Sequence, residues 1–193
     1  GVQKMKTIRN EFATMPEVSS VAISYEIPNG MNGAQPSVFN LGADSTTAVP
    51  MQSLVTDENY ISTYQVPLVD GAFFDSRGLD SGKVIVSEKA IKVLGYSTSS
   101  AAIGRQVRII GDPTIFTIKA VVKDFHFGSM QAGLQPLVFF DVNTALAHRF
   151  LSFKLKPGNL SASIEAIQKK WKQSTPGSSF EYTFMDDTLK KLY

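Results

Sequence analysis

Apolar residues at three- and four-residue steps open the chain and predict an amphipathic helix over residues 3 to 15. The apolar stripe consists of Met5, Ile8, Phe12 and Met15. Pro16 follows the stripe directly and ends the helix. The next segment, EVSSVAISYEIP, alternates polar and apolar positions and therefore predicts a half-buried strand.

Residues 29 to 46 are rich in Gly, Asn and Ser and predict a long loop or a mobile hairpin tip. Phe39 in this loop is a candidate contact for a partner, although a single exposed aromatic residue more often packs locally. AVPMQSLVTD then predicts a second strand. Asp57 at its end is placed to cap a short helix from Tyr60 to Tyr64.

The segment KVIVSEKAIKVLG predicts a strand followed by a helix. Val84 to Val86 form the strand, Ser87 is the expected N-cap, and Gly95 stops the helix. Two strand-like runs then flank the sequence Gly111-Asp112-Pro113, which predicts a hairpin with a loop longer than two residues. LQPLVFFDV predicts a further strand.

A strand, a helix and another strand are expected near the C-terminus, over RFLSFKLKPG, a helical stripe that ends before Pro176, and SFEYTFM. The stripe consists of Leu160, Ile164, Ile167 and Trp171. Asp186 is placed to cap a last helix through Leu189, Leu192 and Tyr193. We expect this helix and the one at the N-terminus to be cut pieces of longer helices.

Helices and strands are mixed, and several neighbouring strands are linked by hairpins, so the sequence predicts the α+β class. The character of the sequence changes near residue 68 and again near residue 142. We therefore expect residues 69 to 141 to be inserted between two flanking pieces, 1 to 68 and 142 to 193, that pack together.

Composition narrows the class of protein further. The chain has 193 residues, of which 43% are hydrophobic and 19% charged, and no apolar run approaches the ~20 residues of a membrane-spanning helix. The net charge is only +2, and the basic residues are scattered along the sequence instead of forming a patch, so we expect no nucleic-acid partner. The absence of cysteine excludes disulfides and thiolate metal sites.

Asp124 and His126 are the strongest candidates for chemistry, because a strand would place both on one face and a carboxylate often orients an imidazole. A catalytic pair needs a third group, however, and a zinc site needs three or four ligands. The only other histidine is His148. We therefore interpret the pair as scaffold at the end of a hairpin, with Phe125 and Phe127 facing the core.

Glycines in NGMNG and GAFF do not form a phosphate-binding loop, because neither stands between a strand and a helix in a known phosphate-binding spacing. The adjacent acids Asp186 and Asp187 are better placed to cap a helix than to share a proton. No metal, cofactor or ATP site is therefore expected in the chain.

Six stretches carry a family resemblance, and they read MPEVSSVAISYEIPNG, DENYISTYQVPLVDGAFF, KVIVSEKAIKVLGY, AIGRQVRI, VVKDFHFGSM with Pro136 before an apolar strand, and SFEYTFMDDTLKKLY. In this order they resemble the MacB-like periplasmic core domain of FtsX-type ABC transporter permeases. The KDFHF form resembles the Bacteroidetes-type branch of that family.

The resemblance implies a two-lobed extracytoplasmic domain in the periplasm, placed between two membrane helices of an inner-membrane protein. A porter-like lobe is expected from residues 1–68 and 142–193, with stalk helices at both ends. A smaller mixed α/β lobe, called Sabre in this family, is expected from residues 69–141.

The resemblance also implies a domain that is not an enzyme and uses no cofactor, since a separate cytoplasmic ATPase binds and hydrolyses ATP. A second permease copy or half and a periplasmic or outer-membrane partner are expected as well. Family members serve export, lipoprotein release or control of cell-wall hydrolases, and nothing in this sequence selects among these roles.

The leading hypothesis is a domain that relays motion of the membrane helices to a substrate or a periplasmic partner. Its candidate relay residues are Ile8, Phe12, Asp186, Leu189 and Leu192. The alternative is a free-standing periplasmic module that binds a ligand. A hydrolase built on Asp124 and His126 is the third possibility.

Overall fold

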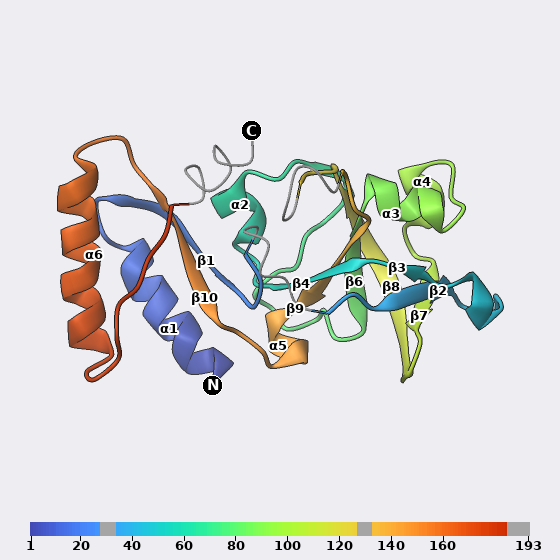
Figure 1. Ribbon diagram of the computed structural model, residues 1–193, viewed down its shortest axis with the longest axis horizontal. Helices are drawn as coiled ribbons and strands as arrows, with labels where there is room; N and C mark the ends of the chain where they lie inside the picture. The colour runs from blue at the N-terminus through green and yellow to red at the C-terminus, as the bar shows by residue number, and fades with distance from the viewer. Residues whose placement is uncertain (28–33, 127–132, 185–193) are drawn as a thin grey trace.

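The computed structural model describes residues 1–27, 34–126 and 133–184, and its strands form one ten-stranded mixed sheet with helices on both faces (Figure 1). The strands are β1 (Val18–Ser24), β2 (Ser37–Asn40), β3 (Val49–Pro50), β4 (Gln52–Thr56), β5 (Leu68–Gly71), β6 (Lys83–Ser87), β7 (Gln106–Ile109), β8 (Asp112–Val122), β9 (Leu137–Asp141) and β10 (Phe150–Leu155). The helices are α1 (Val2–Ala13), α2 (Tyr60–Tyr64), α3 (Glu88–Val93), α4 (Ser99–Ala102), α5 (Val142–Ala145), α6 (Leu160–Ser174) and the 3-10 turn η1 (Ser45–Thr47).

The strand order in the sheet is β10-β1-β4-β9-β6-β8-β7-β2-β3, and β5 pairs with β8 beside this path. Strands β4 and β9 are parallel, as are β6 and β8, whereas the other strand pairs of the described residues are antiparallel. Hairpins and crossovers thus build a single mixed sheet, and the expected α+β class is confirmed.

One end of the sheet is covered by α1 and α6, which pack on β1 and β10 (Figure 1). Leu151, Phe153 and Leu155 of β10 point toward these two helices. Ser152 lies on the opposite face, where its hydroxyl hydrogen-bonds the hydroxyl of Tyr64 in α2. This alternation is the two-residue period of a strand, and it places α1 and α2 on opposite faces.

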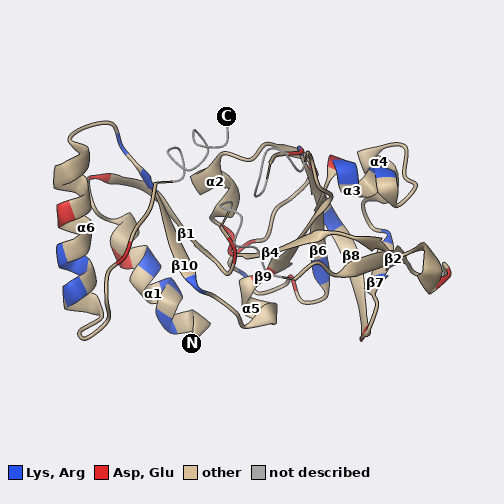
Figure 2. Cartoon of the chain, in the orientation of Figure 1, with Lys and Arg blue, Asp and Glu red and all other residues tan. Residues whose placement is uncertain are grey.

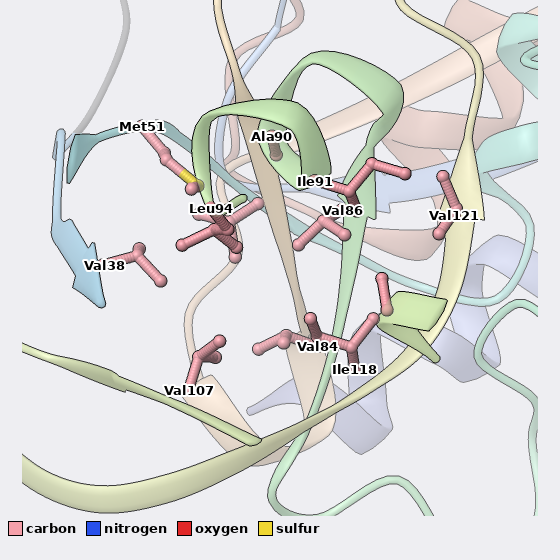
Figure 3. Packing of buried hydrophobic residues seen from close by; sticks show 12 residues of the cluster. Val38, Met51, Val84, Val86, Ala90, Ile91, Leu94, Val107, Ile118 and Val121 are labelled. Carbon is pink, nitrogen blue, oxygen red and sulfur yellow. The ribbon is translucent and has the colours of Figure 1, made fainter. Parts of the chain in front are cut away.

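The central strands β6 and β9 are buried on both faces. Val138 and Phe140 of β9 contact one apolar cluster, which surrounds α3 and is drawn in Figure 3, whereas Leu137 and Phe139 contact a second cluster on the other face. Burial on both sides explains why the segment LVFF is continuously apolar instead of alternating.

The division into two lobes stays a prediction. Strands β2 and β3 lie before residue 68 in the sequence, but β2 pairs with β7 of the middle segment. Strand β4 of the first piece and β9 of the middle segment are parallel neighbours. The sheet therefore runs without interruption across the boundaries that we expected near residues 68 and 142.

Two expectations about the loops were wrong. Residues Ser37–Asn40 of the expected long loop form strand β2, because both its edges find partners in β3 and β7. Phe39 in this strand is 7% exposed, which agrees with local packing and not with a contact for a partner. The hairpin loop between β7 and β8 has two residues and not more, since Ile109 pairs directly with Asp112. Gly111 supplies the positive φ of 86° that this tight turn requires.

The expected strand over SFEYTFM is also wrong for the described residues 179–184, which form no ladder. Phe180, Tyr182 and Phe184 instead contact one another through their rings, at centroid distances of 5.7 and 5.6 Å. Alternating apolar residues are therefore not sufficient evidence for a strand.

Local cap signals were more reliable. Ser87 caps α3 as predicted, and Asn159 caps α6 through its side-chain oxygen. Gly95 follows α3 with a positive φ of 95°. None of the described helices combines the length and apolar character that crossing a bilayer requires.

Candidate functional site

Four charged side chains join α1 to the turn between β4 and α2, where Figure 2 shows basic residues on α1 and acidic residues between α2 and β4. Nη1 of Arg9 donates hydrogen bonds of 2.7 Å to Oδ2 of Asp57 and to Oε1 of Glu58. Nζ of Lys6 donates a 3.0 Å bond to Oε2 of Glu58. The side chains of Arg9 and Asp57 are 6% and 0% exposed, so this is a buried ion-pair network.

The helical period explains why Lys6 and Arg9 act together, because residues three apart lie on the same side of a helix. They flank the apolar residue Ile8, which is buried against β1 and α6. Lys6 and Arg9 are therefore buried together with this face of α1 instead of pointing to solvent.

Asp57 directly follows β4 and bonds to residues of three different segments. Its Oδ2 also accepts a 2.8 Å bond from the amide of Ile23 in β1, and its Oδ1 accepts a 3.1 Å bond from the amide of Asn59. The expected cap of α2 was thus wrong in its details, since Asn59 is the N-cap of α2 and Asp57 precedes it. One carboxylate connects α1, β1 and the start of α2.

Burial controls the electrostatics of the network. Loss of water raises the pKa of Asp57 to about 6, although the hydrogen bonds from Arg9 and Ile23 oppose this shift. For Glu58 burial acts in the same direction, but bonds from its own amide, Lys6 and Arg9 outweigh it and hold the pKa below its usual range. Burial would lower the pKa of Arg9, but Asp57 and Glu58 raise it, so Arg9 remains a cation.

The structure buries two of the predicted relay residues beside this network. Phe12 is 0% exposed, and its ring contacts Phe153 of β10 edge-on at 5.2 Å and stacks on Trp171 of α6 at 6.3 Å. Ile8 is 6% exposed in the same cluster. The other predicted relay residues, Asp186, Leu189 and Leu192, lie outside the described residues.

Sequence reasoning missed the charged half of this attachment. Lys6 and Arg9 beside the apolar stripe of α1 were a readable signal, because they flank it at a helical interval. Their partners Asp57 and Glu58 were not readable, since nothing local to that turn indicates that a helix about 50 residues earlier packs against it.

Asp124 and His126 do not form a pair. Strand β8 ends at Val122, so the two residues do not share a strand face as expected. Oδ1 of Asp124 instead accepts a 2.7 Å bond from the amide of Lys89 in the first turn of α3, which is a structural contact. Within the part of the chain that the structure describes, no three potential ligands gather as a metal site.

The neighbouring aromatic residue follows the prediction. Phe125 packs on the second core cluster, with its ring 6.3 Å from that of Phe139. Phe127 lies outside the described residues. The turn after β8 is therefore attached to the core from the side of Phe125.

Comparisons with known proteins identify the family of the chain. Residues 2–173 match the family described as the MacB-like periplasmic core domain. No curated protein sequence matches the chain significantly.

Three solved structures share the fold at 15% sequence identity. The periplasmic region of MacB from Actinobacillus actinomycetemcomitans has a TM-score of 0.68, and the alignment covers 96% of this chain and 80% of that one. A domain of a putative permease protein from Porphyromonas gingivalis has a TM-score of 0.61, with coverage of 95% and 83%. The extracellular domain of the noncanonic ABC-type transporter YknZ from Gram-positive bacteria has a TM-score of 0.56, with coverage of 88% and 79%.

Proposed function

Because the chain belongs to the MacB-like periplasmic core domain family, we propose that it is a non-catalytic periplasmic domain of an inner-membrane ABC transporter permease. In this proposal the domain relays ATP-driven motion of the membrane helices to a substrate or a periplasmic partner. The observation that supports the relay most directly is the buried attachment of α1 to the sheet through Arg9 and Asp57.

A relay needs a helix that cannot slide or rotate on the body that it moves. Phe12 and Ile8 attach α1 to β10 and α6 by packing, and Arg9 attaches it to the β4–α2 turn by directed hydrogen bonds. Packed cores resist continuous deformation, so a displacement of α1 would be carried into the sheet. Asp186, Leu189 and Leu192 would form the corresponding connection at the other end of the chain.

The proposal assigns ATP binding and hydrolysis to a separate cytoplasmic ATPase, so the domain itself requires no cofactor. A second permease copy or half would provide the body against which this domain moves. A substrate, or a periplasmic or outer-membrane partner, would receive the motion.

Distances between spin labels in the full-length permease with its ATPase test the relay. The chain has no cysteine, so Glu11→Cys on α1 and Thr46→Cys in η1 introduce one label at each end of the domain. We expect the Glu11–Thr46 distance to be the same without nucleotide and with ATP trapped. The distance between Thr46 labels of two permease copies should change between these states.

Arg9→Met in the doubly labelled protein is the decisive variant. Arg77→Met is its control, because Arg77 is exposed and bonds with Asp75 alone among the described residues. Arg9→Met should broaden the Glu11–Thr46 distance distribution, whereas Arg77→Met should leave it unchanged. A Glu11–Thr46 distance that shifts with nucleotide in the unmodified domain would show that α1 moves independently of the sheet, and the relay would be refuted.

A further inference from the structure

A cavity of about 310 Å³ lies where α1, β10, α6 and the segment after α6 meet. This volume is at the lower end of the range of about 300 to 1,000 Å³ that small-molecule sites have. Its apolar lining residues include Met5, Leu151, Phe153, Ile167, Trp171 and Phe180. Such a lining fits the apolar part of a small molecule and does not select a charge by itself.

Polar groups of the same cavity supply a charge preference. Arg149 lines it, and the guanidinium of Arg149 lies 4.5 Å from the ring centroid of Tyr25 and 5.1 Å from that of Phe150. Its Nε donates a 3.3 Å bond to the carbonyl oxygen of Tyr25. These contacts fix the plane of the guanidinium before any ligand arrives.

Arg149 is exposed, and among residues 1–27, 34–126 and 133–184 no acceptor bonds to its Nη atoms and no acid lies within ion-pair distance of it. The carboxyl of Glu26 feels its charge from further away: burial raises the pKa of Glu26, and Arg149 partly opposes this shift. His148 lines the cavity as well, and its Nδ1 is shielded from solvent without a partner among the same residues. A planar fork of free N–H donors matches the two oxygens of a carboxylate.

We propose that this cavity binds a small amphipathic carboxylate, whose apolar body contacts Phe153 and Trp171 and whose carboxylate bonds to Arg149. The exposed acid Glu181 also lines the cavity and opposes an anion, so it weakens the binding without preventing it. The inference goes beyond the proposed relay and does not depend on it. A bound molecule would contact both α1 and the segment after α6.

Fluorescence of Trp171 tests the site directly, because this is the only tryptophan of the chain and it lines the cavity. The 193-residue chain is titrated at neutral pH with decanoate, decylamine and decan-1-ol, which share the apolar chain and differ in charge. We expect decanoate to change the emission saturably and to bind at least roughly tenfold more tightly than decylamine, as a charge-assisted hydrogen bond predicts. Decan-1-ol should lie between them.

Variants locate the binding. Arg149→Gln should weaken decanoate binding about tenfold while leaving decan-1-ol unchanged. Arg105→Gln is the matched control, because Arg105 is exposed and lies outside the cavity, and it should bind decanoate like the unmodified chain. Glu181→Gln should strengthen decanoate binding, since it removes the opposing charge.

Three results would overturn the proposal: no saturable change in emission, equal affinity for the three compounds, or decanoate binding that Arg149→Gln does not weaken. Circular dichroism shows whether Arg149→Gln folds. If it does not fold, the charge series on the unmodified chain decides alone. The relay experiment uses no ligand, so either proposal can fail without the other.

Discussion

Arg9 of α1 and Asp57 after β4 are 48 positions apart in the sequence, yet Nη1 of Arg9 and Oδ2 of Asp57 are 2.7 Å apart in the interior. The same Asp57 oxygen accepts a hydrogen bond from the amide of Ile23. The carboxylate therefore satisfies a backbone donor of β1 and also forms an ion pair. Removing one partner of a buried ion pair is strongly destabilising, because it leaves the other charge buried without compensation.

Arg9→Met should therefore lower the free energy of unfolding by about 3–5 kcal/mol at neutral pH, because it leaves Asp57 buried without its cation. Arg77→Met, in an ion pair whose arginine is 74% exposed, should change it by less than about 1 kcal/mol. Urea denaturation of both variants measures the difference. Equal changes in the free energy of unfolding for the two variants would mean that burial does not increase the contribution of the Arg9–Asp57 pair to stability.

Asp57 should also make stability depend on pH. The pKa of Asp57 is about 6 in the folded chain, against a usual value of 3.8, so between these values the folded state holds a proton that the unfolded state has lost. Stability from this group is therefore highest below pH 4 and falls as pH rises to about 6, with a slope of at most about 1.4 kcal/mol per pH unit.

The variant Asp57→Asn isolates this contribution, because it cannot ionise. The unfolding free energy of the unmodified chain minus that of Asp57→Asn should decrease from pH 4 to pH 6 and stay level from pH 7 to pH 8. Urea titrations at each pH measure it. A difference that increases with pH would show that the ion pair lowers the pKa of Asp57 instead.

Ser87 should be a more important helix cap than Thr98. Oγ of Ser87 accepts the amide of Ala90 at 3.4 Å and also the amide of Leu137 in β9 at 2.9 Å, with the residue fully buried. Thr98 caps α4 at the surface, where its Oγ1 accepts the amide of Ala101 and shares a 3.2 Å bond with the hydroxyl of Ser100. Ser87→Ala should cost about 2–3 kcal/mol and Thr98→Ala about 1 kcal/mol, because only the first leaves a buried strand amide without a partner. Thermal or urea unfolding gives both values, and a larger loss for Thr98→Ala would contradict this reasoning.

Comparing Gly71 with Gly42 tests how much the space available for a Cβ matters, because the two glycines have similar backbone conformations. Both have a positive φ, of 76° and 87°, so both substitutions to alanine carry a backbone penalty of about 1–2 kcal/mol. A Cβ at Gly71 would overlap the carbonyl oxygen of Lys119 in β8, whereas one at Gly42 meets nothing within 4 Å. Gly71→Ala should therefore lose clearly more stability than Gly42→Ala in urea unfolding. Similar losses would indicate that β5 moves away from β8 at small cost.

Local signals predicted much of the fold correctly. The stripe of α1, the cap at Ser87 and the end of α3 at Gly95 depend on residues within one or two turns, and all three agree with the structure. Strand β2 was missed because it is only four residues long and stands in a Gly- and Asn-rich segment, which hides the strand preference of Val38 and Phe39. Its edges are satisfied by β3 and β7, which lie elsewhere in the sequence.

The candidate site likewise contains residues that the sequence predicted and residues that only the structure revealed. The period of α1 was sufficient to place Ile8 and Phe12 in the core, since apolar burial requires only one buried face. Their neighbours Arg9 and Asp57 needed the tertiary structure, because a charge is satisfied by one particular partner in one geometry.

The sequence alone therefore determined most of the longer helices and strands, the faces that they bury, and the family to which the chain belongs, but not the short strands β2 and β5. Only the tertiary structure decided that one sheet runs from β10 to β3, that Asp57 receives Arg9, and that Arg149 keeps free donors beside an apolar cavity. The physical reason is the distance in sequence between the residues that interact. Periodicity and caps act between neighbours in the sequence, whereas strand pairing, ion pairs and cavities join residues that only folding brings together.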